Sequence, residues 1–190
     1  MYLAQILPFP TEATEHPALV PQESTARPRL QTRIHATSGL KRSAVSGANP
    51  ARNEILIERP IETVWQRLIA AQSWPGWYSN ARDVVVADPS GQLGQDGSFT
   101  WETFGLHITS KVAEFVPETR LGWYGNGNDL RAYHTWLLTP RGPNETQIVT
   151  EEVALGRGAQ MLAQTNPGHM HRGHDLWNIS LKFLCESPPQ

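Results

Sequence analysis

Apolar and polar residues alternate along the middle of the chain in a pattern that predicts β-strands. Five segments show this alternation, at residues 98–104, 107–116, 120–125, 131–139 and 146–155. Turn signals that contain glycine or proline separate them. Two short apolar segments, at 53–59 and 83–87, predict earlier strands. Closely spaced strands with turns throughout are typical of an antiparallel meander.

Helical periodicity brackets this series of strands. Pro60 suits the first turn of a helix, and an apolar stripe follows it, made by Val64, Trp65, Leu68 and Ile69. We expect that helix to end at the sequence Ser73-Trp74-Pro75-Gly76. A longer helix is predicted from Asn166 to about Glu186, with a stripe formed by Met170, Gly173, His174, Trp177, Leu181 and Leu184. One face of such a sheet must be buried against another element, and only the long helix is large enough to cover it. The pattern therefore predicts an α+β fold.

Large aromatic residues occupy alternating positions on the predicted strands. The chain has seven tryptophans. Trp101, Trp123 and Trp136 each lie on the side of a strand that carries the apolar majority. A sheet face with so many large rings is either packed or lines a cavity, so we look for function there.

The turns also predict which residues pair across the strands. If Leu138 pairs with Ile148 across the last hairpin, then His134 pairs with Glu152. The preceding hairpin then places Trp123 beside His134. Because a slip of one residue would turn all these side chains to the opposite face, the sequence makes a testable prediction that Trp123, His134 and Glu152 are neighbours.

A histidine and a glutamate side by side on an apolar face allow three interpretations. Such a buried pair is costly unless its members bond to each other or to a partner. The pair can be structural, can anchor a hydroxyl or carbonyl group of a bound ligand, or can act as a general acid and base. We therefore take His134 and Glu152 as candidate catalytic residues, with the other two interpretations left open.

The sequence His169-Met170-His171-Arg172-Gly173-His174 suggests a metal site, but its helical spacing argues against one. Residues two apart on a helix point about 200° apart, so His169 and His171 cannot share an ion. His171 and His174 can, but two imidazoles with no acidic or thiol partner nearby make a poor zinc site. We expect no metal and no cofactor, and no phosphate-binding loop or serine elbow is present.

Residues 1–50 differ from the rest of the chain. They hold six of the fifteen prolines and no tryptophan. We predict a proline-rich, largely flexible extension there, in which 29–50 can add an edge strand, and a domain over 51–187. No segment is apolar enough to span a membrane and no secretory signal is recognisable, which together with a single cysteine, Cys185, predicts a cytoplasmic protein without stable membrane insertion. A net charge of −2 gives no indication of nucleic-acid binding.

Several segments together resemble a known family. They are ILIERPIETVWQRLIAAQSWPGW, FTWETF, ITSKVAEFVPETRLGWYG, HTWLLTP and TQIVTEEVALG, and they extend over residues 53–185. They resemble the START-like or SRPBCC superfamily, also called helix-grip or Bet v 1-like, in its polyketide cyclase/dehydrase and lipid-transport branch. The resemblance implies a curved seven-stranded antiparallel sheet around a long C-terminal helix. It also implies two short helices between the first two strands and a cavity between sheet and helix.

From the resemblance and the aromatic face we expect a protein that binds a small hydrophobic molecule such as a lipid or polyketide. The residues expected to contact the ligand are Phe99, Trp101, Thr103, Trp123, His134, Trp136, Thr150, Glu152, Met170, His174 and Trp177. One alternative is an enzyme of the polyketide cyclase or dehydratase type with His134 and Glu152 as acid and base. Another is a protein-interaction module. The sequence determines neither the ligand nor the oligomeric state.

Overall fold

A computed structural model of the chain describes residues 49–188. Of the predicted N-terminal extension, residues 1–48 lie outside this range, and Asn49 and Pro50 belong to the first strand. The first strand therefore begins two residues before the predicted domain boundary. It is an edge strand of the sheet.

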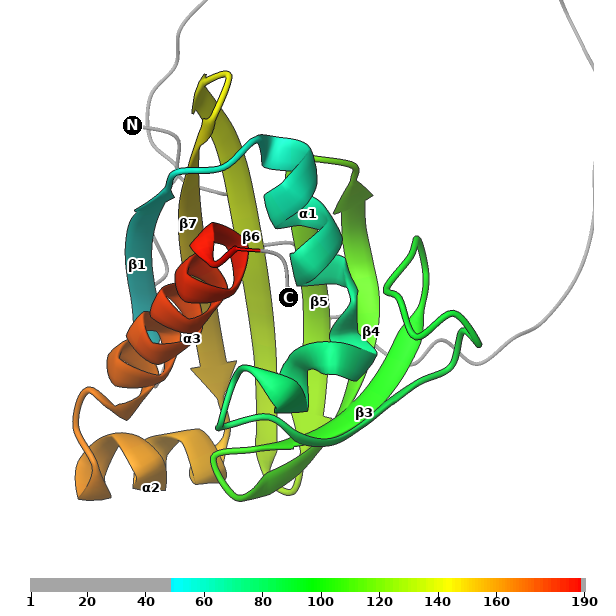
Figure 1. Ribbon diagram of the computed structural model, residues 1–190. Coiled ribbons are helices and arrows are strands. Elements are labelled where there is room, and N and C mark those ends of the chain that lie inside the picture. Colours follow the sequence, from blue (N-terminus) through cyan, green and yellow to red (C-terminus); the bar gives the residue numbers. More distant parts are fainter. Residues whose placement is uncertain (1–48, 189–190) are drawn as a thin grey trace, which may run out of the picture. The chain divides into compact units, whose positions relative to one another are not determined.

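Seven antiparallel strands form one curved sheet, and the helices lie against its concave side (Figure 1). The strands are β1 (Asn49–Ile57), β2 (Arg82–Val86), β3 (Ser98–Thr103), β4 (Leu106–Val116), β5 (Arg120–Gly127), β6 (Leu130–Gly142) and β7 (Glu145–Leu155). Their order across the sheet is β1-β7-β6-β5-β4-β3-β2. The predicted seven-stranded α+β fold is confirmed.

Two short helices lie between β1 and β2, as the family resemblance implied. They are α1 (Ile61–Ile69) and a 3₁₀ helix, η1 (Ala71–Gly76). The predicted stripe of α1 is correct, because Val64, Trp65, Leu68 and Ile69 are all buried. The predicted end of α1 was wrong: the helix stops at Ile69, and the sequence Ser73-Trp74-Pro75-Gly76 belongs to η1, which turns Trp74 into the core.

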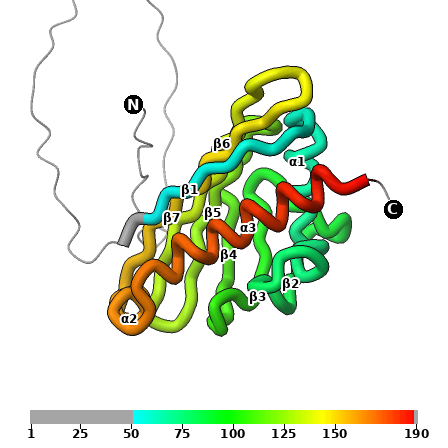
Figure 2. Tube along the Cα trace, turned by 60° about the vertical axis from the view of Figure 1, so that its left-hand side comes forward, coloured from blue at the N-terminus to red at the C-terminus, as the bar shows by residue number. Residues whose placement is uncertain are grey.

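The C-terminal part contains one helix that the sequence analysis missed. Helix α2 (Arg157–Thr165) precedes the predicted long helix, α3 (His169–Glu186). Figure 2 shows α3 running obliquely across the strands. It presents Trp177, Leu181 and Cys185 to the core. Among the described residues, no helix combines the length and the apolar character needed to span a bilayer.

The predicted strand register is confirmed at every pair that bears on the site. Leu138 pairs with Ile148, and His134 pairs with Glu152. Trp123 pairs with His134 across β5 and β6. The three residues expected to be neighbours are therefore neighbours, on the face of the sheet that α3 covers.

Candidate functional site

A small cavity lies between the sheet and helices α2 and α3. Its volume is about 50 Å³. Eight of the predicted ligand-contacting residues line it, namely Trp101, Thr103, Trp123, His134, Glu152, Met170, His174 and Trp177. The half-buried residues Phe104, Leu106, Leu130 and Leu162 also line it, and since they are partly exposed they mark its mouth.

Three of the predicted ligand-contacting residues do not line the cavity. Phe99 and Trp136 are buried inside the aromatic core, where Phe99 packs on Trp74 and Trp136 packs on Trp177. Thr150 is buried too, and its hydroxyl donates a hydrogen bond of 3.0 Å to Oδ1 of Asn178. All three lie on the predicted concave face. Neighbouring side chains fill the space between them and α3, so the cavity does not extend to them.

The sequence analysis also missed part of the cavity wall. The missed residues are Tyr78, Phe104, Leu106, Ile108, Gly125, Leu130, Ala132, Ala154, Leu162 and His169. Gly125 and Ala154 lie two positions along their strands from Trp123 and Glu152 and so face the same side of the sheet. Their small size leaves room for the cavity. Leu162 belongs to the helix that was not predicted.

Stacked aromatic rings fill the rest of the space between sheet and helix. Trp177 of α3 stacks face to face on Tyr78, with ring centroids 4.5 Å apart. Its ring also lies 5.1 Å from Trp74 and 5.1 Å from Trp136. The predicted aromatic face is therefore partly core and partly cavity wall. Trp136 is a core residue, as is Trp74 of η1, and Trp123 and Trp177 lie between that core and the cavity.

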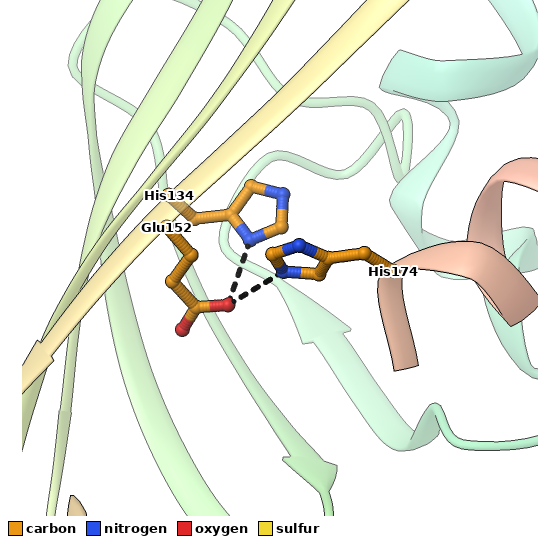
Figure 3. Close-up of side chains that lie close together, drawn as sticks. All are labelled: His134, Glu152 and His174. Carbon is orange, nitrogen blue, oxygen red and sulfur yellow. Dashed lines mark hydrogen bonds and ion pairs between the residues drawn. The ribbon is translucent and has the colours of Figure 1, made fainter. Parts of the chain in front are cut away.

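One carboxylate and two imidazoles meet on the cavity wall (Figure 3). Nδ1 of His134 lies 3.2 Å from Oε2 of Glu152, and Nε2 of His174 lies 2.9 Å from the same oxygen. The side chains of His134, His174 and Glu152 are 5%, 2% and 17% exposed. Figure 3 shows the second carboxylate oxygen turned away from both rings. We call these three residues the His-Glu-His cluster.

The protonation of the cluster follows from its hydrogen bonds and its burial. An ionised carboxylate can only accept, so both ring nitrogens that face Oε2 must donate. Burial acts against the ionised form of Glu152, but the hydrogen bonds from the two histidines outweigh it and hold the pKa of Glu152 far below its usual range. Desolvation lowers the pKa of His134 and favours its neutral form. The cluster is therefore an anionic carboxylate held by two imidazoles.

Three different elements position the cluster. His134 and Glu152 are register partners on β6 and β7. The ring of His134 stacks parallel on Trp123, with centroids 4.6 Å apart and an angle of 4° between the planes. His174 comes from α3, whose first turns are tied to β1 because Asn53 donates to Oδ1 of Asp175 at 2.6 Å.

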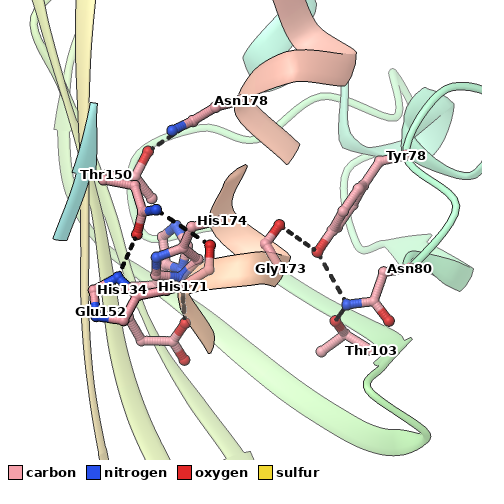
Figure 4. Close-up of polar contacts among 11 residues, drawn as sticks. Tyr78, Asn80, Thr103, His134, Thr150, Glu152, His171, Gly173, His174 and Asn178 are labelled. Atoms are coloured by element: carbon pink, nitrogen blue, oxygen red, sulfur yellow. Dashed lines mark hydrogen bonds and ion pairs between the residues drawn. The ribbon is translucent and has the colours of Figure 1, made fainter. Parts of the chain in front are cut away.

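A second polar network lies on the opposite wall of the cavity (Figure 4). Nδ2 of Asn80 donates to the hydroxyl oxygen of Tyr78 at 3.0 Å and to Oγ1 of Thr103 at 3.2 Å. The side-chain oxygen Oδ1 of Asn80 accepts from the backbone N–H of Phe104 at 3.1 Å, so Asn80 holds the turn that carries Phe104. Burial raises the pKa of Tyr78 to about 12, so the phenol stays protonated at neutral pH.

Phe104 closes the mouth of the cavity against α3. Its backbone has a φ of 52°, a left-handed conformation that is unusual for a bulky residue. Its ring packs where Gly173 leaves space, since a Cβ at Gly173 would lie 2.2 Å from Cζ of Phe104. The absence of a side chain at Gly173 thus creates the seat of the Phe104 ring.

Gly173→Ala should destabilise the native chain but stabilise a chain that also carries Phe104→Ala. In the native chain the new methyl group displaces the ring, and we expect a loss of about 1 kcal/mol of unfolding free energy, since overpacking outweighs the gain in helix propensity. In the Phe104→Ala background the seat is empty, and the same substitution should stabilise by about 0.5–1 kcal/mol. Urea unfolding of the four proteins measures both effects. Equal effects in both backgrounds would show that the ring does not occupy this seat.

His174 has an acidic neighbour that could not be recognised from the histidine-rich segment alone. Glu152 comes from β7, far from His174 in the sequence, and lies beside it. His171 is exposed and points elsewhere, with Nδ1 3.1 Å from Oδ1 of Asn53. His169 is buried beside the ring of Phe104. The predicted exclusion of a pair formed by His169 and His171 is consistent with this geometry.

Several solved protein structures have a fold similar to that of this chain. A hypothetical protein from Helicobacter pylori superposes with a TM-score of 0.68 at 26% identity, covering 83% of this chain and 100% of that one. The ZhuI aromatase/cyclase from Streptomyces sp. R1128 gives 0.62 at 12% identity, with 73% and 94% covered. A START superfamily protein from Mycobacterium smegmatis gives 0.53 at 11% identity, with 71% and 98% covered.

The latter two likenesses concern the fold alone, and no curated protein sequence matches the chain significantly. The family assignment rests instead on the sequence of the domain itself. The family described as polyketide cyclase / dehydrase and lipid transport matches residues 51–172, from the third residue of β1 to the first turn of α3. With its seven-stranded sheet, its long C-terminal helix and the cavity between them, the chain belongs to the polyketide cyclase / dehydrase and lipid transport family.

Proposed function

We propose that the protein binds a small hydrophobic molecule that carries one hydrogen-bond donor, such as a hydroxyl group. The observation that supports this is the His-Glu-His cluster on the wall of an otherwise largely apolar cavity. Ligand sites typically combine an apolar lining with a few polar groups that fix the orientation of the ligand. The second oxygen of Glu152, turned away from both histidines, is the acceptor for the ligand.

The volume of the cavity limits what it holds without a conformational change. An engineered apolar cavity of about 150 Å³ accommodates benzene, whereas this cavity measures about 50 Å³. A polyketide or lipid must therefore displace part of the wall. The α2 side is the part to move, because only Ala159 of that helix is buried and Leu162 lies at the mouth.

The first test is mass spectrometry of the purified full-length protein under native and then denaturing conditions. A co-purified organic molecule that is released on denaturation supports the proposal and identifies its chemical class. Tryptophan emission during titration with lipids and aromatic polyketides provides the second measurement, because Trp101, Trp123 and Trp177 line the cavity. A chain that retains nothing and shows no change of emission with any of these compounds contradicts the proposal.

Ala132→Leu should weaken ligand binding by filling the cavity. Ala132 lines it and pairs with Gly125 and Ala154, so three added carbon atoms project into the remaining space. We expect the affinity for any ligand found to fall at least tenfold, measured by fluorescence titration. The matched control is Ala87→Leu at an exposed position, which should bind like the native chain. Undiminished binding by Ala132→Leu would place the ligand elsewhere.

The same cluster supports a second candidate function, acid–base catalysis of the cyclase or dehydratase type. A neutral imidazole that donates to a carboxylate keeps its other nitrogen free to accept a proton, which is the arrangement of a general base. His134 and His174 each have a buried ring nitrogen without a protein partner. Product formation from a poly-β-ketone, compared between the native chain and Glu152→Gln, tests this candidate.

A further inference from the structure

Three metal-ligating atoms converge at the cavity. One ligand atom from each of His134, Glu152 and His174 lies within 4.8 Å of the other two. The ring nitrogens that face Oε2 of Glu152 are Nδ1 of His134 and Nε2 of His174. They come from β6, α3 and β7, so the convergence is produced by the tertiary fold (Figure 3). Among the described residues, it is the one group of three such side chains that could surround an ion.

Over residues 49–188, no permanently charged cation balances the carboxylate of the cluster. Glu114 is paired with Arg120 at 2.6 Å, and Glu186 is paired with Lys182 at 2.6 Å. Glu152 is met only by imidazoles, and within the described part of the chain no lysine or arginine lines the cavity. A buried carboxylate is costly without a cation or a full set of hydrogen-bond donors. A cation bound at this point would provide the missing charge.

We propose that His134, Glu152 and His174 bind a divalent transition-metal ion such as Zn²⁺ or Co²⁺. Two imidazole nitrogens and one carboxylate oxygen suit these ions, whereas Mg²⁺ and Ca²⁺ favour sites built of oxygen atoms alone. Three protein ligands leave a further coordination position. That position faces the cavity, because all three residues line it. The sequence analysis had argued against a metal at His171 and His174 because it found no acidic or thiol partner near them.

The two separations that involve Oε2 of Glu152 are close to those expected between ligands of such an ion. Zinc ligands at about 2.0–2.1 Å in a tetrahedron lie about 3.3 Å from one another. The observed separations from Oε2 are 3.2 Å to His134 and 2.9 Å to His174. In the metal-bound form, each histidine would carry its proton on the ring nitrogen that faces away from the ion. The nitrogen that now faces Glu152 would present its lone pair to the ion.

The surroundings of the histidines set the expected strength of binding. Metal-bound histidines usually donate from the outer nitrogen to a protein acceptor, and loss of that bond costs about 10–100-fold in affinity. Nε2 of His134 and Nδ1 of His174 are buried without such a partner. We therefore expect binding about 10–100-fold weaker than at a site whose histidines have these partners.

The experiment uses the full-length chain, treated with a chelator and then dialysed against Co²⁺ or Zn²⁺ with no organic ligand present. We expect one ion per chain, visible absorption bands of bound Co²⁺, and their loss when Zn²⁺ displaces it. Glu152→Gln and His174→Ala should each lower the affinity at least tenfold. Near-ultraviolet circular dichroism confirms that each variant is folded, and Glu152→Gln conserves the shape of the side chain.

Two controls exclude binding elsewhere on the chain. His107 is exposed and distant in sequence from the cluster, so His107→Ala should bind like the native chain. The double variant His16→Ala/His35→Ala tests the two histidines of the N-terminal region and should also bind normally. The proposal is overturned if the folded native chain binds no Co²⁺, if binding survives in both cluster variants, or if it disappears in either control. Because no organic ligand is used, the outcome is independent of the proposed function.

Discussion

Trp74→Ala should lower the free energy of unfolding by about 3–5 kcal/mol, the range for loss of a large buried ring. The side chain of Trp74 is fully buried. Its ring lies within 6 Å of four others, those of Phe99, Trp101, Trp123 and Trp177. These rings come from β3, β5 and α3, so they cannot all close on the space that Trp74 leaves. The substitution also removes the donor to the carbonyl of Leu68, 3.0 Å away.

The sequence offers a matched control three residues away. Trp77 lies just after η1 and is only half-buried, so Trp77→Ala should cost clearly less, about 1 kcal/mol. Urea unfolding followed by far-ultraviolet circular dichroism measures both variants at the same temperature. Similar losses for Trp74→Ala and Trp77→Ala would show that the centre of the core is not where the structure places it.

Glu152→Ala should cost about 2–4 kcal/mol of unfolding free energy, because it leaves two buried N–H donors without an acceptor. Each such donor costs about 1–3 kcal/mol, and the two are Nδ1–H of His134 and Nε2–H of His174. Glu152→Gln keeps a carbonyl oxygen that can accept from both rings but loses the charge that strengthens these bonds. We therefore expect Glu152→Gln to cost less than Glu152→Ala, about 1–2 kcal/mol.

Both variants are compared by urea unfolding in the presence of a chelator, so that metal ions do not contribute. The neighbouring Glu151 serves as control, since its ion pair with Arg52 at 3.4 Å is exposed. Glu151→Ala should change the unfolding free energy by no more than about 0.5 kcal/mol. If Glu152→Gln proved as damaging as Glu152→Ala, the charge of the carboxylate, rather than its role as an acceptor, would hold the cluster together.

The part of the site that lies on the sheet could be predicted because strands obey a strict periodicity. Alternation fixes which residues face inward, and the turn between β6 and β7 fixes the pairing, so the contact between His134 and Glu152 follows from local rules. The same rules place Trp123 against His134. No comparable rule links a helix to a sheet. The approach of His174 to Glu152 depends on the angle at which α3 crosses the strands, and many distant contacts set that angle.

Helix α2 and the size of the cavity could not be predicted from the sequence either. The segment Arg157–Thr165 is short and buries only Ala159, and Met161 is exposed, so few of its residues indicate a contact with the core. Its first residue follows Gly156, whose φ of 104° marks a sharp change of chain direction. The cavity volume depends on side-chain rotamers of the tryptophans and on the seat of Phe104 at Gly173. Periodicity predicts the direction of a side chain but not how closely neighbouring rings stack.

The parallel stack of Trp123 on His134 gives the protein an internal optical sensor. Light absorbed by any indole of the core can migrate to Trp123, because neighbouring rings are close, as with Trp74 at 5.8 Å and Trp177 at 6.1 Å. An imidazole in face-to-face contact with an excited indole alters its emission, and the alteration depends on whether the imidazole is neutral, protonated or coordinated. The emission of Trp123, and of the indoles that transfer energy to it, should therefore report the state of His134, and a change at the site can be sought without any added dye.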